Sequence, residues 1–276
     1  MAGKKNNIHV LILRTAGTNC DLETKVAFEK LNAKVELVHV NELVKSKSKI
    51  YKYQIIAFPG GFTYGDDIAA GRILANELKM KLKEQLQKFL DTNGLMIGIC
   101  NGFQMLVKTG LLPGNHIWGQ EVTLGCNDSA KFEDRWVYLK KPEDRRQKSE
   151  VRKKKKIQCV WTRDIDEVIY LPVAHGEGKF IAKDKKVLKS LRDNGQVVFQ
   201  YCSCDGKLPG YPENPNGSDD HIAGICDQTG KIFGLMPHPE RFVFRTQHPR
   251  WTREDASLGA DGLKIFKNGM DFLKRA

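Results

Sequence analysis

The sequence predicts an α/β protein that has a mostly parallel central sheet with helices on both faces and antiparallel additions. Three observations predict it. Buried-strand and amphipathic-helix patterns alternate through the first 112 residues, the second half is richer in strand patterns, and 41% of the 276 residues are hydrophobic. Alternation of this kind favours parallel strands covered by helices on both sides. Because no internal repeat or clean linker occurs, we expect a single domain over residues 1–276.

The strand patterns of the first half are short apolar runs that end in turn residues, as buried strands do. They cover residues 9–14, 34–40, 53–62 and 94–100. Helical patterns separate and follow them. These are a helix over 23–32 with Val26, Ala27 and Leu31 on one face, a helix over 72–90 with Leu74, Leu78, Leu82, Leu86 and Phe89 at helical spacing, and a helix over 101–112.

The second half carries strand patterns with turns between them. They cover residues 135–139, 157–162, 167–180, 196–201, 221–227 and 231–240. The turn Asp227–Gly230 joins two of these segments, which predicts antiparallel additions to the sheet. The chain closes with a predicted helix over 259–276, in which the residues that recur at three- and four-residue steps are Leu263, Phe266, Met270 and Leu273.

Composition excludes several classes of protein. No apolar run approaches the ~20 residues that span a bilayer. The N-terminus is basic but has no cleavage site of small residues, so we expect a cytoplasmic start and no membrane segment. The seven cysteines are an odd number without a disulfide framework, which is typical of reduced thiols in a cytosolic protein.

The net charge of +12 comes largely from one segment. Residues 140–156 contain ten Lys/Arg against three Asp/Glu and so supply +7. Because this basic insert has little aromatic interleaving on which bases could stack, no nucleic-acid partner is predicted. A solvated loop, or a charge-steered contact with a partner or a phosphorylated substrate, fits the segment better.

The segment MIGICNGFQMLVKTGLL, residues 96–112, carries the main chemical signal. It begins as a buried strand, continues as an amphipathic helix, and places Cys100 at the bend between Gly98 and Gly102. The spacing is that of a nucleophile elbow with cysteine in place of serine. The helix that follows points its positive end at the thiolate, and the amide of Asn101 can serve as an oxyanion donor. A buried cysteine at a strand end is the competing interpretation.

A thiolate that attacks an acyl group needs a histidine and a third group that orients it. Two histidines end apolar strands and have a carboxylate two residues on: His175 with Glu177, and His238 with Glu240. Residues i and i+2 of an extended segment point the same way, so either glutamate can hold its histidine ring. Spacing does not choose between the pairs. H-x-E also opens the zinc-deaminase signature, but its P-C-x-x-C part is missing, and no metal site is predicted.

The stretch FPGGFTYGDD, residues 58–67, is the third element of the predicted site. A double glycine after a buried strand lets backbone amides turn toward an anion or an oxyanion. A plain sharp turn is the alternative. We expect Asp66 and Asp67 to cap or solvate this turn rather than to bind a metal.

Together these segments resemble the class I glutamine amidotransferases, which have a flavodoxin-like fold. Within that family they are most similar to the glutaminase components of phosphoribosylformylglycinamidine synthase. The segments that carry the resemblance are RTAGTNCD (14–21), FPGGFTYGDDIAAGRI (58–73), GICNGFQMLVKTGLLPG (98–114), NDSAKFEDRWVYL (127–139), LPVAHGEGKF (171–180), NPNGS (214–218), IAGI (222–225) and GLMPHPER (234–241).

The resemblance implies a Cys-His-Glu triad. In it, Cys100 is the nucleophile, His238 is its base, and Glu240 orients His238. His175 is then assigned to the surroundings of the glutamine site or to a partner contact.

The resemblance also implies the groups that bind the substrate and its oxyanion. The backbone amides of Gly61 and Asn101 form the oxyanion hole, and Gln104 helps to hold the glutamine substrate.

The implied activity is hydrolysis of glutamine, with ammonia passed to an ATP-dependent synthetase. That synthetase converts formylglycinamide ribonucleotide to formylglycinamidine ribonucleotide in purine biosynthesis. The sequence has no G-x-x-x-x-G-K-[ST] segment and no room for a synthetase. No cofactor is therefore expected in this chain, and ATP and Mg are expected on the synthetase subunit. A small third subunit is a further expected partner.

Two features depart from the family pattern without touching the triad. The first motif lacks the aromatic-proline pair that many relatives have before Gly17, and the insert at 140–156 is richer in lysine. Two alternatives stay open: a glutamine amidotransferase that serves a different acceptor, and a non-enzymatic docking subunit on the same fold.

Overall fold

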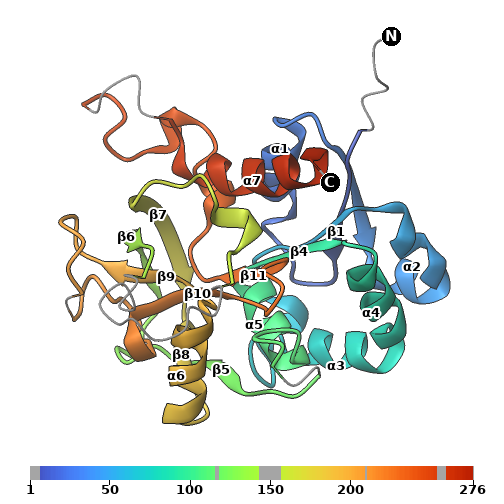
Figure 1. Cartoon of the computed structure of the whole chain (residues 1–276), viewed down its shortest axis with the longest axis horizontal. Coiled ribbons are helices and arrows are strands. Elements are labelled where there is room, and N and C mark those ends of the chain that lie inside the picture. Colours follow the sequence, from blue (N-terminus) through green and yellow to red (C-terminus); the bar gives the residue numbers. More distant parts are fainter. Residues whose placement is uncertain (1–6, 116–117, 143–156, 209, 254–258, 276) are drawn as a thin grey trace, which may run out of the picture.

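The computed structural model describes residues 7–115, 118–142, 157–208, 210–253 and 259–275. Within these ranges, nine strands form the central sheet in the order β2-β1-β3-β4-β11-β10-β9-β6-β7. One half of this sheet is parallel and the other is antiparallel, and helices cover it (Figure 1). The α/β class predicted from the sequence is therefore confirmed.

Five strands form the parallel half. They are β1 (His9–Arg14), β2 (Lys34–His39), β3 (Ile55–Phe58), β4 (Leu95–Ile99) and β11 (Ile232–Leu235). Every neighbouring pair among them runs parallel. The register pairs Phe58 with Gly98, and Ile99 with Leu235, so β3, β4 and β11 end at the same edge of the sheet. Side chains that follow these strands meet at this carboxyl edge, where open α/β sheets bind ligands.

Four antiparallel strands extend the sheet beyond β11. They are β10 (Ile222–Cys226), β9 (Val197–Cys202), β6 (Glu133–Lys140) and β7 (Val168–His175). A separate pair, β5 (Val122–Gly125) and β8 (Lys179–Ala182), is also antiparallel. The backbone N–H of His238 donates to the carbonyl of Pro172 in β7 at 2.8 Å. The antiparallel half thus anchors the segment that follows β11.

Helices lie on both faces of the sheet. Their bounds are α1 (Asp21–Glu29), α2 (Val40–Lys45), α3 (Arg72–Lys81), α4 (Lys83–Asp91), α5 (Asn101–Thr109), α6 (Lys185–Asn194) and α7 (Asp261–Arg275). Figure 1 shows α1 and α7 above the parallel strands and α3, α4 and α5 below them. Because both faces are covered, every residue of β3, β4 and β11 is buried.

Three details of the predicted elements differ from the structure. The pattern over 72–90 forms two helices, because the chain leaves helical geometry at Leu82 (φ −130°, ψ 8°), although all five predicted apolar residues are buried. In α1, Val26 is exposed and Phe28 takes the core position instead. Residues 157–162 are not a strand; Val160–Thr162 form a 3-10 helix whose Trp161 packs against α7.

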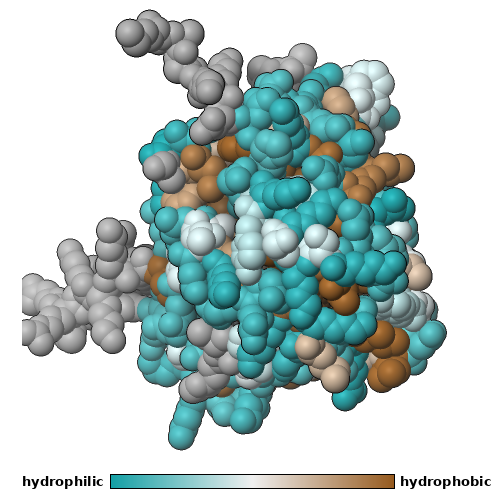
Figure 2. Space-filling view, turned by 90° about the vertical axis from the view of Figure 1, so that its right-hand side faces the viewer, coloured by the Kyte–Doolittle hydropathy of each residue, from teal (hydrophilic) through white to brown (hydrophobic). Residues whose placement is uncertain are grey.

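Two helices escape prediction because they bury little. Helix α2 has six residues and buries two side chains. In α6 the apolar residues Val187, Leu188 and Leu191 share one face of a mostly charged segment, and Leu191 is buried. The face of the molecule that carries α2 and α4 is mostly hydrophilic, with hydrophobic side chains in small separate groups (Figure 2).

Most of the basic insert predicted at 140–156 lies outside the described residues; within it, the structure describes 140–142 alone. Among the helices that the structure does describe, none combines the length and the apolar character needed to cross a membrane.

The last helix holds the segment that follows β11. Helix α7 packs against the 3-10 helix Pro239–Arg241. In its first turn, Gly262 has no room for a side chain, because a Cβ there would lie 1.9 Å from the carbonyl oxygen of Pro239. The Asp261 carboxylate accepts a hydrogen bond from the Tyr170 amide of β7 at 3.1 Å. Helix α7 therefore fixes this segment from the outside of the sheet.

We expect Gly262→Ala to lower the free energy of unfolding by about 2–3 kcal/mol, because the added Cβ overpacks a contact with rigid backbone. Urea denaturation followed by circular dichroism measures this change. Gly259→Ala is the matched control three residues earlier, where an added Cβ meets none of the described residues within 4 Å. Equal stabilities of the two variants would contradict the tight contact between α7 and Pro239.

Candidate active site

Cys100 lies at the bend between β4 and α5, as the sequence predicts. Its backbone has φ 50° and ψ −106°, a conformation that residues with a side chain rarely adopt. Hydrogen bonds hold this bend on both sides: the Cys100 N–H donates to the Leu235 carbonyl at 2.9 Å, and the Cys100 carbonyl accepts from the Gln104 N–H at 3.0 Å. A strained residue at a strand-to-helix turn is the geometry of a nucleophile elbow.

The glycines on either side of Cys100 are required by packing. A Cβ on Gly98 would lie 2.6 Å from the carbonyl oxygen of Gly102. A Cβ on Gly102 would lie 1.9 Å from the carbonyl oxygen of Phe58, at the end of β3. The bend is therefore pressed against its own strand and against the neighbouring strand, and any side chain at these two positions would push it away.

His238 and Glu240 form a buried pair beside this bend. His238 Nδ1 and Glu240 Oε1 are 2.6 Å apart, and the two side chains are 2% and 0% exposed. A carboxylate can only accept, so His238 donates from Nδ1. The other ring nitrogen, Nε2, is buried and has no hydrogen-bond partner among the described residues. Glu240 thus holds the ring as predicted, although Pro239–Arg241 form a 3-10 helix and not the extended segment that the i, i+2 argument assumed. Nε2 is left for proton exchange.

The surroundings of the His238 ring favour its protonated form. Burial alone would lower its pKa, because a dry environment penalises the imidazolium. Glu240 and the thiols of Cys100 and Cys20 outweigh burial and raise the pKa of His238 well above its ordinary value. The protonated ring is therefore favoured between a carboxylate and a thiol, and such a group can give up a proton and take it back.

Gly61 lies in the loop after β3, against the turn that follows β1. Its φ is 145°, and a Cβ there would lie 2.6 Å from the Gly17 carbonyl oxygen and 2.8 Å from the Asn19 nitrogen. Only glycine fits this position. A Cβ on the preceding Gly60 would lie 2.8 Å from Cε1 of His238. The double glycine therefore lets this loop pack closely against His238 and against the turn after β1. The oxyanion role of Gly61 stays a prediction.

The side chains of Asn101 and Gln104 connect the loops around the bend. Asn101 Oδ1 accepts from the Thr63 amide at 3.2 Å, and its Nδ2 donates to Asp66 Oδ1 and Gln104 Oε1, both at 3.0 Å. Gln104 Nε2 donates to the carbonyl of Glu177. Asp66 also accepts a backbone N–H from its own loop, so it caps the turn as expected. Both ends of the Gln104 amide are engaged within the protein, and its predicted substrate contact stays a prediction.

His175 does not pair with Glu177, so the i, i+2 argument is wrong for this pair. Its Nδ1 faces Asn127 Oδ1 at 3.1 Å, and the Glu177 carboxylate accepts from the Ala70 amide at 3.3 Å. Asn127 Nδ2 donates to the carbonyls of Lys131 and His175, so its Oδ1 is the acceptor and His175 donates from Nδ1. Burial lowers the pKa of His175 to about 3. A ring that stays neutral takes up a proton poorly and has none to give to a leaving group, which favours His238 for both roles.

Two residues that the sequence reasoning did not single out also border the site. The Cys20 sulfur lies 3.9 Å from His238 Nδ1, and the Arg241 guanidinium donates to this sulfur at 3.2 Å. Cys20 directly precedes α1. The signal that could have found it is its place after the first strand, because the carboxyl ends of parallel strands share one edge.

One group of side chains in the described part of the chain offers three atoms of metal-ligating types. The ligand atoms of Cys20, His238 and Glu240 lie within 4.8 Å of one another. Their surroundings do not suit a cation. The Nδ1 proton is already shared with Glu240, and the Arg241 guanidinium places a positive charge 3.2 Å from the Cys20 sulfur. We interpret the group as a hydrogen-bonded site without a metal.

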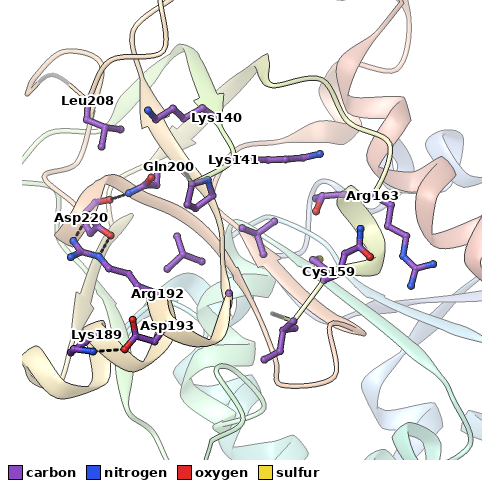
Figure 3. Close-up of a pocket in the computed structure, with 17 residues that line it drawn as sticks. Lys140, Lys141, Cys159, Arg163, Lys189, Arg192, Asp193, Gln200, Leu208 and Asp220 are labelled. Atoms are coloured by element: carbon purple, nitrogen blue, oxygen red, sulfur yellow. Dashed lines mark hydrogen bonds and ion pairs between the residues drawn. The ribbon is translucent and has the colours of Figure 1, made fainter. Parts of the chain in front are cut away.

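A separate cavity of about 480 Å³ borders β6, β9 and α6 (Figure 3). Charged side chains on its wall pair with each other, Arg192 with Asp220 and Lys189 with Asp193. Its described lining includes Cys159 but no histidine. The described lining therefore offers Cys159 no histidine base for acyl transfer, and the site at Cys100 is the better candidate.

Known proteins are similar to the chain over nearly its whole length. The CobB/CobQ-like glutamine amidotransferase domain matches residues 7–273. The phosphoribosylformylglycinamidine synthase subunit PurQ of Dehalococcoides mccartyi is 49% identical, over 98% of this chain and 99% of that protein. The PurQ subunit of Methanococcus maripaludis is 39% identical, over 96% of this chain and 97% of that protein. A chain in the solved structure of PurLQS from Thermotoga maritima matches with 28% identity and a TM-score of 0.70, over 97% of this chain and 99% of that one.

The buried His175 should make the protein less stable in acid. Its pKa is about 3 in the folded protein and about 6.5 in the unfolded chain. Between these values the unfolded chain binds a proton that the folded protein excludes, so stability falls as pH falls. Urea denaturation should show a loss of about 1 kcal/mol from about pH 6 to pH 5 that is absent in His175→Gln. Equal pH slopes in the two proteins would contradict a neutral, buried His175.

Proposed function

The chain belongs to the CobB/CobQ-like glutamine amidotransferase family, and we propose that Cys100, His238 and Glu240 hydrolyse glutamine at the carboxyl edge of its sheet. The chain is the glutaminase subunit of phosphoribosylformylglycinamidine synthase, and relatives of up to 49% identity are the subunit PurQ of that synthase. The ammonia it releases is used to convert formylglycinamide ribonucleotide to formylglycinamidine ribonucleotide in purine biosynthesis.

The observation that carries the proposed mechanism is the buried His238–Glu240 pair beside the strained Cys100. A protonated imidazole in dry surroundings attracts a neighbouring thiolate strongly, because little water screens the two charges. The start of α5 adds the positive end of a helix dipole on the same side. Together these groups place positive charge beside the sulfur that attacks the carboxamide in the proposed reaction.

In the first half of the proposed reaction, the Cys100 thiolate attacks the carboxamide carbon of glutamine. A C–S bond forms, and negative charge moves to the carbonyl oxygen, where the backbone N–H groups of Gly61 and Asn101 stabilise it. His238 then gives its Nε2 proton to the nitrogen as the C–N bond breaks, and ammonia leaves a γ-glutamyl thioester. Glu240 keeps the ring in the orientation that points Nε2 at the reacting atoms.

In the second half, water hydrolyses the thioester. The neutral His238 takes a proton from the water as its oxygen attacks the carbonyl carbon. The C–S bond breaks, glutamate leaves, and the thiolate and imidazolium are restored. One glutamine and one water give one glutamate and one ammonia. We therefore propose that the chain needs no metal or cofactor of its own for this step.

We further propose that a synthetase subunit binds this chain, and that ATP and Mg bind to that subunit. The similarity to a chain in the PurLQS structure of Thermotoga maritima supports such an assembly and a third subunit. The sequence has no phosphate-binding G-x-x-x-x-G-K-[ST] loop, which supports an ATP site on the partner. The cytoplasmic location expected from the sequence stays a prediction.

Two exposed aromatic rings on the rim of the site are our candidates for the contact with the synthetase. Phe62 directly follows Gly61 and is 48% exposed, and Phe132 is 53% exposed. Their ring centroids are 6.5 Å apart, and Phe132 lies over Gly176, beside the other loop of the site. Exposed aromatic side chains are typical anchors of protein interfaces.

We expect Cys100→Ala to remove glutamine-dependent activity from the assembled complex, by about 10⁴-fold or more, because the variant lacks the thiol that forms the thioester in the proposed reaction. Ammonia-dependent activity should stay within about twofold, because the synthetase site is untouched. The measurement is the rate of formylglycinamidine ribonucleotide formation with glutamine and with ammonium chloride.

Cys126→Ala is the matched control for this substitution, because Cys126 is a free and exposed cysteine. It should keep both activities. Loss of both activities in an assembled Cys100→Ala complex would contradict the division of labour between the two subunits.

The double variant Phe62→Ser/Phe132→Ser should bind the synthetase subunit at least about tenfold more weakly, a change of about 1.4 kcal/mol. Isothermal titration calorimetry measures the affinity. Met80→Ser is the control, since Met80 is a hydrophobic side chain on α3 that is 86% exposed. An unchanged affinity of the double variant, or an equal loss in Met80→Ser, would place the interface elsewhere.

A further inference from the structure

Cys20 has no part in the mechanism above, although it lies between the His238–Glu240 pair and Arg241. We propose that Cys20 is a positioning residue: its thiol holds the Arg241 guanidinium away from Glu240, so that this carboxylate serves His238 alone. The inference rests on the proposed function of the site.

Several contacts fix the Cys20 thiol in place. Its sulfur lies 3.9 Å from His238 Nδ1 and accepts a hydrogen bond from Arg241 at 3.2 Å. Its S–H donates to Asn19 Oδ1 at 3.1 Å. The backbone N–H of Cys20 donates to the Gly60 carbonyl at 3.2 Å, and a Cβ on Gly60 would lie 3.1 Å from the sulfur. The sulfur is buried and has little room to move.

The thiol separates its neighbours without adding a charge. Burial raises the pKa of Cys20, and although His238 and Arg241 act to lower it, the pKa stays above its ordinary value. Cys20 is therefore a neutral thiol at neutral pH, as its donation to Asn19 requires. The neutral thiol accepts a hydrogen bond from the Arg241 guanidinium. The negative charge of Glu240 therefore interacts with His238 and is not neutralised by Arg241.

Glu240 has an oxygen that would attract a competing cation. Its Oε1 accepts from His238, but its Oε2 is buried and has no hydrogen-bond partner in the described part of the chain. Arg241 is the next residue, and its other anchor is the surface residue Glu23, at 3.3 Å. A guanidinium matches a carboxylate in a two-pronged geometry. Without the Cys20 sulfur, we expect Arg241 to turn toward Glu240.

Such an ion pair would change the proton affinity of His238. The titratable and charged groups around the His238 ring are Glu240, Cys100, Cys20, Arg241 and the neutral His175. Glu240 is the only carboxylate in this set. If Arg241 neutralised it, burial would dominate and the pKa of His238 would fall. His238 would then lose, at lower pH, the proton that ammonia needs to leave.

The test uses the complex of the full chain with its synthetase subunit. It compares Cys20→Ala, Cys20→Ser and Cys20→Ala/Arg241→Met with the wild type. Cys202→Ala is the matched control, because Cys202 is a buried free thiol on β9. The readouts are the pH dependence of kcat/KM for glutamine, the rate with ammonium chloride, and the labelling of Cys100 by a glutamine-mimicking diazoketone, followed by mass spectrometry.

In Cys20→Ala, we expect the alkaline limb of the kcat/KM profile, which reports loss of the His238 imidazolium, to move down by about one pH unit. Above this limb, kcat/KM for glutamine and the labelling rate should fall about tenfold, while the ammonia-dependent rate stays unchanged. Cys20→Ser keeps a hydrogen-bonding group of smaller volume and should shift the limb less. The double variant Cys20→Ala/Arg241→Met also lacks the guanidinium, so its alkaline limb should return to the wild-type position. The control Cys202→Ala should not move the limb.

A wild-type profile in Cys20→Ala would overturn the proposal. A double variant as impaired as the single variant would also overturn it, because Cys20 would then act through packing alone. If Cys20→Ala does not assemble with the synthetase subunit, the pH profile of Cys20→Ser is the test. An unshifted alkaline limb in Cys20→Ser would then contradict the proposal. A wild-type complex that shows neither glutamine-dependent activity nor labelling of Cys100 would instead overturn the proposed function of the site.

Discussion

The site depends on one constraint: a charged imidazole that is buried away from water must be compensated by a partner that cannot move. His238 meets this constraint through Glu240 at 2.6 Å. Removing both groups from water is costly, and the attraction between them offsets that cost only if the geometry is fixed. Fixed geometry requires glycine at two positions. A side chain at Gly60 would push against the His238 ring, and one at Gly102 would push against the end of β3. Helix α7, through Gly262, holds the same segment from outside.

A second consequence is that the loops at the carboxyl edge behave as one unit. The Asn101 side chain joins the loop after β3 to α5, and Gln104 joins α5 to the loop after β7. The Cys20 backbone joins the turn after β1 to Gly60. Loss of one partner in such a network leaves the other buried and unpaired, at a cost of about 1–3 kcal/mol. The geometry of the site and the stability of this edge are therefore coupled.

Local patterns predict the parts of the structure that local physics decides. Alternating strands and helices predict the layered sheet, and Cys100 between two glycines predicts the bend. Tertiary contacts decide the rest. Spacing does not say that the helical pattern will break at Leu82, and the three apolar residues of α6, Val187, Leu188 and Leu191, stand out little in a mostly charged segment. The apolar run at 157–162 resembles a strand, but its Trp161 packs against α7 from a 3-10 helix.

The two H-x-E pairs show why spacing cannot assign the chemistry of a histidine. Both histidines end a strand pattern and have a glutamate two residues on. At His238 the glutamate accepts the Nδ1 proton, and its charge reverses the effect of burial on the pKa. At His175 a neutral amide from Asn127 takes that place, so burial lowers the pKa to about 3. Asn127 is 48 residues away in sequence. The charge of the group that accepts the Nδ1 proton determines whether each ring is protonated or neutral. The tertiary structure, and not the local spacing, determines which group that is.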